Sequence, residues 1–254
     1  MLLLTGLIGQ RVLTPDGREA GRLADLAVRL DGAASSRMVE RLVLRLPGGR
    51  LAMLPWDLVG GFPPGVLVLT SAPEPAGFDR AGLAGALTSD EILLKRDVLD
   101  TQVVDVVGQR LARVADVVLR RTDGHLEVLG VEVGFSGVLR RLGLRRKPVE
   151  EDIVAWSDLH LTSERGHRVQ LSTPRSAVHR LDARGLASLV SRVGVEAANE
   201  ILAVRDPQLA VDAVRVVHPE VAKRIRRRSV LSGRRFFRSG VWPHRRHLIR
   251  QRRS

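Results

Sequence analysis

Cysteine and tyrosine are both absent from this 254-residue chain, and only 3% of its residues are aromatic. Without cysteine the chain has no disulfide, no thiolate metal site and no cysteine nucleophile. Its cores must therefore be built mostly from Leu, Val and Ala, which is feasible because 44% of the residues are hydrophobic. The lack of cysteine also fits a reducing compartment and favours a cytoplasmic location.

Long uninterrupted apolar runs are missing as well. The nearest candidate, residues 60–71, is broken by proline and is shorter than the roughly 20 residues that cross a bilayer. Residues 1–9 have no basic stretch ahead of their apolar side chains, so we expect the edge of a folded domain rather than a signal peptide. These absences predict no transmembrane segment and a location in the cytoplasm, at most peripheral to a membrane.

Patterns typical of enzymes are not found. The histidines lack HExxH spacing, residues 134–137 (GFSG) are one residue short of a nucleophile elbow, and there is no Walker loop or GxGxxG. His160 and His167 are expected in a polar connector, and His218 precedes a proline, where it can cap a helix. We therefore predict a protein that is not an enzyme and holds no cofactor.

A thirteen-residue pattern occurs twice in the chain. Residues 17–29 (GREAGRLADLAVR) return 91 positions later as residues 108–120 (GQRLARVADVVLR), with five identities. Each copy is followed by a tryptophan in an apolar setting, Trp56 and Trp156, and then by Leu-Thr-Ser. Repetition of this length predicts two copies of one small fold.

Both copies have the pattern of short β-strands joined by tight turns. We expect strands at 23–30, 39–46, 51–54, 66–70, 117–120 and 126–133, with hairpins at Gly48-Gly49 and Asp123-Gly124. The Ala-, Gly- and Pro-rich residues 72–91 are expected to be a linker with one short helix at 79–87. Residues 137–147 are expected to form a basic excursion from the second copy.

From about residue 176 the apolar period changes from two residues to 3.6. Leu186, Leu189, Val190 and Val193 share one helical face. Gly194 marks a helix end, and the pairs at 206–207 (Asp-Pro) and 218–219 (His-Pro) mark helix starts. The sequence predicts an array of short helices at 176–228, after polar connectors at 164–176.

The net charge of +13 is confined to the C-terminal end. Residues 223–254 contain 13 Lys and Arg and no acidic residue, so the rest of the chain is charge-balanced. Arginine pairs with phosphate and stacks on nucleobases. Phe236, Phe237 and Trp242 are interleaved with the basic residues of this segment, as in proteins that bind single strands. The residues predicted to bind a polyanion are Arg226, Arg227, Arg228, Arg234, Arg235, Arg238, Arg245, Arg246, Arg250, Arg252 and Arg253.

The target of this basic segment, residues 223–254, is left open by its composition. RNA or the ribosome is the preferred partner, because phosphate contacts release counterions. An anionic membrane surface would suit the same mixture of arginine and aromatic side chains. A third interpretation is a solvated tail without a dedicated target, and in each case we expect disorder at 229–254.

Residues 94–120 (LKRDVLDTQVVDVVGQRLARVADVVLR) resemble the opening of PRC-barrel domains, the small β-barrels of the photosynthetic reaction-centre H subunit and of a ribosome-maturation factor. Residues 130–143 and the Trp156 motif fit the same family, and the first copy shares Gly17, Asp25 and the Trp56 motif. The resemblance implies an α+β chain that begins with two small antiparallel PRC-type barrels, at 1–71 and 92–163. Such barrels are binding or assembly modules without a known active site.

Residues 181–227 resemble the intracellular N domain of MgtE-type magnesium transporters from bacteria. In those transporters the domain contributes acidic residues to magnesium sensing, which implies magnesium as the one metal to consider. Arg184 and Arg215 stand where carboxylates would be useful, and Mg²⁺ prefers carboxylate oxygen and water. The chain has no membrane channel of its own, so it cannot transport the ion alone.

Several other residues are candidates for a site. Asp25 and Asp116 recur at matching positions and are expected to accept hydrogen bonds from backbone amides within their own barrels; the alternative is a pair of ligands across a groove. Trp56 and Trp156 are expected to fill the barrel cores, with stacking on a partner as the alternative. The acidic triplet at 150–152 (Glu-Glu-Asp) is expected to be a solvated loop rather than a metal site.

Taken together, these patterns predict a non-catalytic cytoplasmic adaptor or regulatory protein. The barrels and the helical array would bind a protein partner, while the basic tail contacts RNA or the ribosome. The alternative is a magnesium-responsive regulator associated with a divalent-cation transport system.

Overall fold

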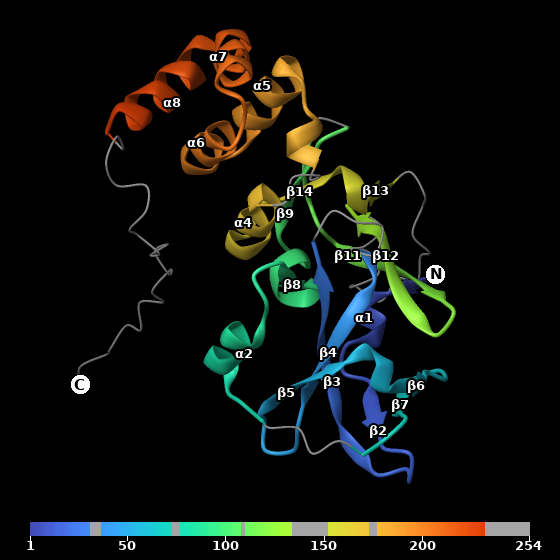
Figure 1. Cartoon of the computed structure of the whole chain (residues 1–254). Coiled ribbons are helices and arrows are strands. Elements are labelled where there is room, and N and C mark those ends of the chain that lie inside the picture. Colours follow the sequence, from blue (N-terminus) through green and yellow to red (C-terminus); the bar gives the residue numbers. More distant parts are fainter. Residues whose placement is uncertain (31–36, 73–76, 108–109, 134–151, 173–176, 232–254) are drawn as a thin grey trace, which may run out of the picture.

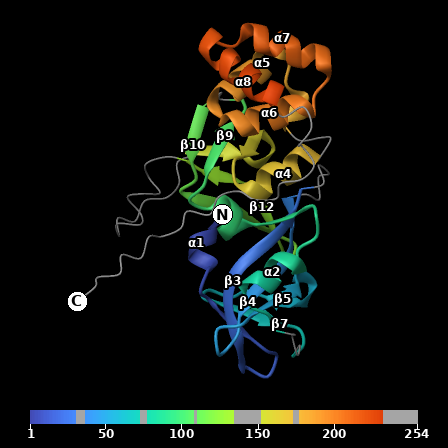
Figure 2. The ribbon, with the colours of Figure 1, turned by 90° about the vertical axis from the view of Figure 1, so that its left-hand side faces the viewer.

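The chain is an α+β protein in which a β-rich half is followed by a helical array (Figures 1 and 2). The structure, a computed structural model, describes residues 1–30, 37–72, 77–107, 110–133, 152–172 and 177–231. The predicted α+β class with antiparallel sheets is confirmed. The predicted basic excursion at 137–147, most of the acidic triplet at 150–152 and all residues after Leu231 lie outside the described residues.

The first repeat supplies most of a seven-stranded sheet. The elements of this repeat are β1 (Leu2–Leu3), α1 (Leu4–Leu7), β2 (Arg11–Leu13), β3 (Glu19–Arg29), β4 (Val39–Arg45), β5 (Leu51–Pro55), η2 (Trp56–Leu58), β6 (Val59–Gly61) and β7 (Val66–Leu69). The seventh strand of the sheet is β8 (Glu91–Leu93) of the second repeat, which pairs with β3. The strand order is β5-β4-β3-β2-β7-β6, antiparallel except for the β2–β7 pair. The predicted hairpin joins β4 to β5, where Gly48 and Gly49 both adopt a positive φ that favours glycine.

The second repeat forms two smaller sheets. Its elements are β8 (Glu91–Leu93), η3 (Leu94–Val98), β9 (Gln102–Asp105), β10 (Arg110–Arg113), β11 (Asp116–Thr122), β12 (His125–Glu132), β13 (Ile153–Ala155), η5 (Trp156–Asp158) and β14 (Leu159–Leu161). The predicted hairpin at Asp123-Gly124 joins β11 to β12. The predicted helix in the linker is α2 (Arg80–Ala86), which begins where Asp79 accepts a 2.7 Å hydrogen bond from Gly82 N.

Each repeat pairs its first short strand with the other repeat. β1 lies antiparallel to β11, with Leu2 opposite Leu119, and β8 lies antiparallel to β3, with Ile92 opposite Val28. The two pairings are equivalent in register, because Val28 and Leu119 are the same position of the repeat. Leu2 and Leu3 therefore pair with the second repeat, whereas Gly9 N donates to Leu23 O within the first repeat.

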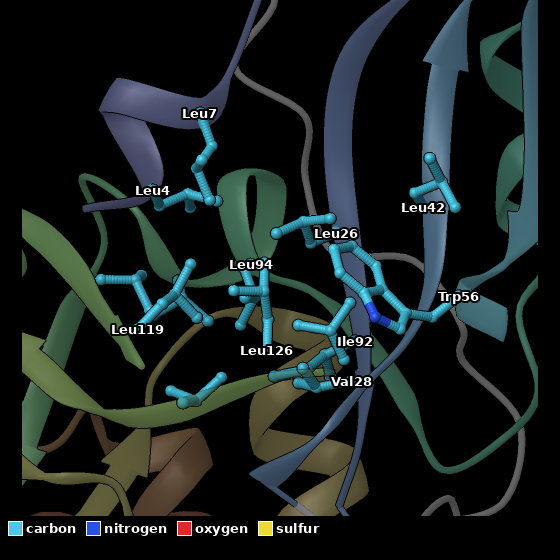
Figure 3. Packing of buried hydrophobic residues seen from close by; sticks show 14 of the residues in the cluster. Leu4, Leu7, Leu26, Val28, Leu42, Trp56, Ile92, Leu94, Leu119 and Leu126 are labelled. Carbon is cyan, nitrogen blue, oxygen red and sulfur yellow. The ribbon is translucent and has the colours of Figure 1, made fainter. Parts of the chain in front are cut away.

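One hydrophobic core serves both repeats. Figure 3 shows Leu4 and Leu26 from the first repeat converging on Leu94 and Leu119 from the second. All four are completely buried. Within the described residues none of the three sheets closes on itself through its strand pairings, so the observed architecture is one of open sheets packed around a common core.

Five α-helices and one 3-10 turn make up the rest of the described chain. They are α4 (Glu164–Ser172), η6 (Ala177–Arg180), α5 (Ala183–Arg192), α6 (Val195–Ala203), α7 (Pro207–Val216) and α8 (Pro219–Leu231). Asp182 and Asp206 cap α5 and α7 with their side chains, and the predicted start of α7 at Asp206-Pro207 is confirmed. Figure 2 shows α5, α6, α7 and α8 at the opposite end of the molecule from β7, with α4 between them and the strands of the first repeat.

Two expectations about this half are wrong. The polar connectors predicted at 164–176 include the helix α4, whose buried contacts are partly polar and so leave a weak apolar pattern. Gln170 of α4 accepts a 2.6 Å hydrogen bond from Leu161 N and donates one of 3.1 Å to Leu159 O, which extends the edge of β14. Residues 229–231, expected to be disordered, are instead the last residues of α8, and the residues that follow lie outside the described ones.

Candidate functional site

The helix α8 carries the start of the basic segment. Its apolar side holds Ala222 and Ile225, which are 7% and 4% exposed, in contact with the rest of the array, while Lys223 and Arg224 are exposed. Arg226, Arg227 and Arg228 continue this helix. The other eight predicted polyanion-binding residues, from Arg234 to Arg253, lie outside the described residues. The basic segment therefore begins within a helix that packs on the array.

The folded body compensates many of its charges through ion pairs. The Arg41 guanidinium forms a bidentate pair with the buried Glu91 carboxylate, and Arg96 pairs with Asp97 in the same way. Exposed pairs such as Arg11–Glu19, at 2.8 Å, contribute little free energy each. Residues 1–222 are therefore charge-balanced, with many of their charges in ion pairs, whereas the basic segment contains no acidic residue.

Asp25 and Asp116 connect the two repeats. Asp25 accepts hydrogen bonds from Lys95 N at 2.7 Å and Arg96 N at 3.1 Å, at the start of η3. Asp116 accepts bonds from Thr5 N at 3.2 Å and from the Thr5 hydroxyl, at the start of α1. The expectation of backbone amides within the same repeat is confirmed in part, because Asp25 also accepts from Leu26 N at 2.8 Å and Asp116 from Val117 N at 2.9 Å; the donors from the opposite repeat are not expected from the sequence. Each aspartate caps the first helical turn of the opposite repeat.

The Asp25 carboxyl has an unusual protonation equilibrium. Burial raises its pKa to about 6, although backbone N–H donors from Lys95, Leu26 and Arg96 favour the ionised form. Its side chain lies within the shared core region, with the residue only 6% exposed. A carboxyl so enclosed cannot reach a soluble substrate, which fits a structural role for this group.

Both tryptophans are buried, as expected. Trp56 and Trp156 are 3% and 7% exposed and belong to the shared core. The Trp56 indole also donates a 3.1 Å hydrogen bond to Gly124 O, in the β11–β12 hairpin of the other repeat. Neither ring is available for stacking on a partner in this arrangement.

A hydrogen-bonded chain of two histidines and a glutamate joins the sheets to the helices. His160 Nε2 lies 2.8 Å from His167 Nδ1, and His167 Nε2 lies 2.7 Å from a carboxylate oxygen of Glu200. The three residues come from β14, α4 and α6. With Glu200 ionised and both imidazoles neutral, His167 donates to Glu200, and His160 donates to His167.

Burial keeps these imidazoles neutral. It lowers the pKa of His160 to about 3, helped by the neighbouring His167. Burial also lowers the pKa of His167, against the opposing influence of Glu200. His160 is only 1% exposed, so the chain links elements rather than presenting a base to a substrate. The expected polar connector is wrong for both histidines, because His160 lies in β14 and His167 in α4. No sequence motif indicates that these two side chains form a hydrogen bond.

Other candidate residues have simple structural roles. His218 Nδ1 accepts a 3.4 Å hydrogen bond from Glu220 N at the start of α8, which confirms it as a helix cap. Within the ranges that the structure describes, no cluster of three or more His, Asp or Glu side chains is placed to hold a metal ion. In the same ranges, no helix has the length and apolar character needed to cross a membrane.

Comparison with models of known protein families gives no match for this chain, and no curated protein matches it either. The similarity to PRC barrels and to the MgtE N domain therefore stays a prediction from the residues quoted above.

Proposed function

We propose that this protein is a non-catalytic adaptor whose basic segment contacts a phosphate polyanion, preferably RNA or the ribosome. The two repeats, as modules of the PRC-barrel type, and the helical array would bind a protein partner in the cytoplasm. The observation that carries the proposal is the concentration of 13 Lys and Arg, with no acidic residue, in residues 223–254.

The attachment of this segment supports the proposal. Ile225 belongs to the core of the array and Val221 packs against it, so the helix in which the basic segment begins is held on the array. Arginine contacts with phosphate act through counterion release, which is strongly dependent on salt. If about six phosphates of a single strand are neutralised, log K falls with log salt at a slope of about −4.

The structure indicates where to cut the chain for a test. Truncation in the first turns of α8 would remove Ile225 from the core of the array, and a cut further along would shorten the helix, so the cut belongs after Leu231. This cut removes eight of the 13 bases and keeps the helix. Binding of a labelled single-stranded RNA, followed by fluorescence anisotropy over a range of salt, compares the truncated and complete chains.

We expect the truncated chain to bind RNA more weakly and with a shallower salt slope. Arg18→Gln and Arg215→Gln, which remove exposed charges from the body, serve as controls and should bind like the complete chain. Vesicles with anionic lipid form a second arm, and binding to vesicles but not to RNA would identify a membrane surface instead. Equal RNA binding by the truncated and complete chains would refute the proposed role.

A further inference from the structure

A cavity with a basic lining lies between α4 and Ser89, in the segment that leads into β8. Figure 1 shows α4 close to β8. Its volume is about 290 Å³, and its lining residues are Ser89, Arg165, Arg168, Val169 and Ser172. The four residues from α4 are spaced i, i+3, i+4 and i+7, so they share one face of the helix. The described lining contains no carboxylate.

The two arginines of this cavity are held by hydrogen bonds that leave donors unused. Arg165 Nε donates to Glu91 O at 2.6 Å, and its Nη2 donates to Thr88 O. Arg168 Nη2 donates to the Glu164 carboxylate one helical turn away. Nη1 of each guanidinium makes no hydrogen bond to the described part of the chain. Anchored groups with spare donors lose little conformational entropy when they bind a ligand.

The electrostatic surroundings favour an anion. The nearby carboxylates of Glu91 and Asp97 are already neutralised by Arg41 and Arg96. Burial and then the positive charge of Arg96 lower the pKa of Arg165, while Asp97 and Glu91 oppose this. The site thus holds a cation that is partly desolvated, and a bound anion would compensate it.

We propose that this cavity binds the phosphate group of a small molecule, either free phosphate or a phosphate ester. The two guanidinium groups and the Ser89 hydroxyl supply N–H and O–H donors suited to phosphate oxygens. The volume is at the lower end of small-molecule pockets, which begin at about 300 Å³. The site belongs to α4 and the segment before β8, so it is separate from the basic segment and from the proposed contact with RNA.

Thermal unfolding of the complete chain tests this proposal. Inorganic phosphate and glycerol phosphate are titrated in separate arms at constant ionic strength. Ligand that binds only the native state raises Tm, by about 5 °C at a hundredfold excess over Kd for a chain of this size. A rise with both compounds indicates a site for phosphate itself, and a rise with glycerol phosphate alone indicates an ester site.

Variants identify the cavity as the place of binding. Arg168→Gln should abolish the rise, while Arg215→Gln should keep it. The two arginines are matched, since their side chains are 63% and 69% exposed and each pairs with a carboxylate on its own helix. Ser89→Asp, at an exposed position, should also abolish the rise by placing a negative charge at the cavity.

The proposal is overturned if the complete chain shows no rise, or if Arg168→Gln and Ser89→Asp respond like Arg215→Gln. In that last case phosphate acts at other arginines of the chain. RNA binding by all three variants should be unchanged, so this test and that of the basic segment fail separately.

Discussion

The hydrogen bond between Asp116 and Thr5 offers a direct test of how the two repeats stabilise each other. Asp116 is 2% exposed and accepts from Thr5 N at 3.2 Å, from the Thr5 hydroxyl, and from Val117 N at 2.9 Å. Of these three bonds, the two to Thr5 cross between the repeats. Replacing Asp116 by Ala removes the cap of α1 and leaves donors without their charged acceptor.

The expected cost follows from these bonds. A hydrogen bond to a charged group contributes about 1.5–3 kcal/mol, and loss of an N-cap side chain costs about 0.5–2 kcal/mol. We therefore expect Asp116→Ala to lower the free energy of unfolding by about 2–4 kcal/mol. Thr5→Val, which removes the hydroxyl but keeps the branched shape, should cost about 1 kcal/mol.

A double-mutant cycle, measured by urea unfolding, separates the contact between repeats from the local bond. Because either substitution breaks the hydroxyl–carboxylate bond, Asp116→Ala and Thr5→Val together should cost about 1 kcal/mol less than their sum. Asp25→Ala with Thr5→Val is the matched control and should be additive, since Asp25 caps η3 through backbone N–H groups. Additivity within about 0.3 kcal/mol for the Asp116 pair would refute a stabilising contact between the repeats.

Three further predictions concern protonation and metal. Burial raises the pKa of Asp25 to about 6, so its contribution to stability is largest below pH 3.8 and is lost as the pH rises through 6. In urea unfolding, Asp25→Asn should therefore gain about 2 kcal/mol relative to the parent chain between pH 4 and pH 7. His160 behaves in the opposite sense, because burial lowers its pKa to about 3 and stability is lost as the pH falls below 6.5. His160→Gln should therefore lose less stability in acid than the parent chain, and an unchanged acid profile would count against a buried neutral imidazole. Titration with millimolar Mg²⁺ tests the magnesium-responsive alternative, because an ion that binds the native state raises Tm, and an unchanged Tm would count against that alternative.

The reciprocal pairing of the repeats had a signal in the sequence that is easy to miss. Leu2-Leu3-Leu4 and Ile92-Leu93-Leu94 are 90 positions apart and occupy equivalent places in the two exchanged segments. The thirteen-residue repeat has a spacing of 91 positions. Because the spacing of these two segments is one residue shorter, an alignment without gaps does not show that the similarity extends to them. Aligning the two copies with a gap would have shown the similarity, although it could not have shown that each segment pairs with the opposite copy.

The hydrogen-bonded chain from His160 through His167 to Glu200 had no such signal. The two histidines are seven residues apart across a strand–helix junction, and Glu200 lies a further 33 residues along. Polar contacts of this kind depend on how β14, α4 and α6 pack together. The helix α4 also lacks a clear signal in the sequence. Its buried face includes polar residues such as Gln170, so the apolar period of a helix is weak there.

Local chemistry in the sequence determined the β-rich half, its glycine hairpins, the capped starts of α2 and α7 and the separation of charge toward the C-terminal end. These features depend on backbone conformation, helix capping and side-chain charge within a few residues of each other. Only the tertiary structure decided that β1 and β8 exchange partners, that Asp25 and Asp116 cap the opposite repeat, and that one core serves both. These pairings depend on the difference in free energy between packing a segment on its own repeat and packing it on the other repeat. That difference involves residues about 90 positions apart and cannot be derived from either segment alone.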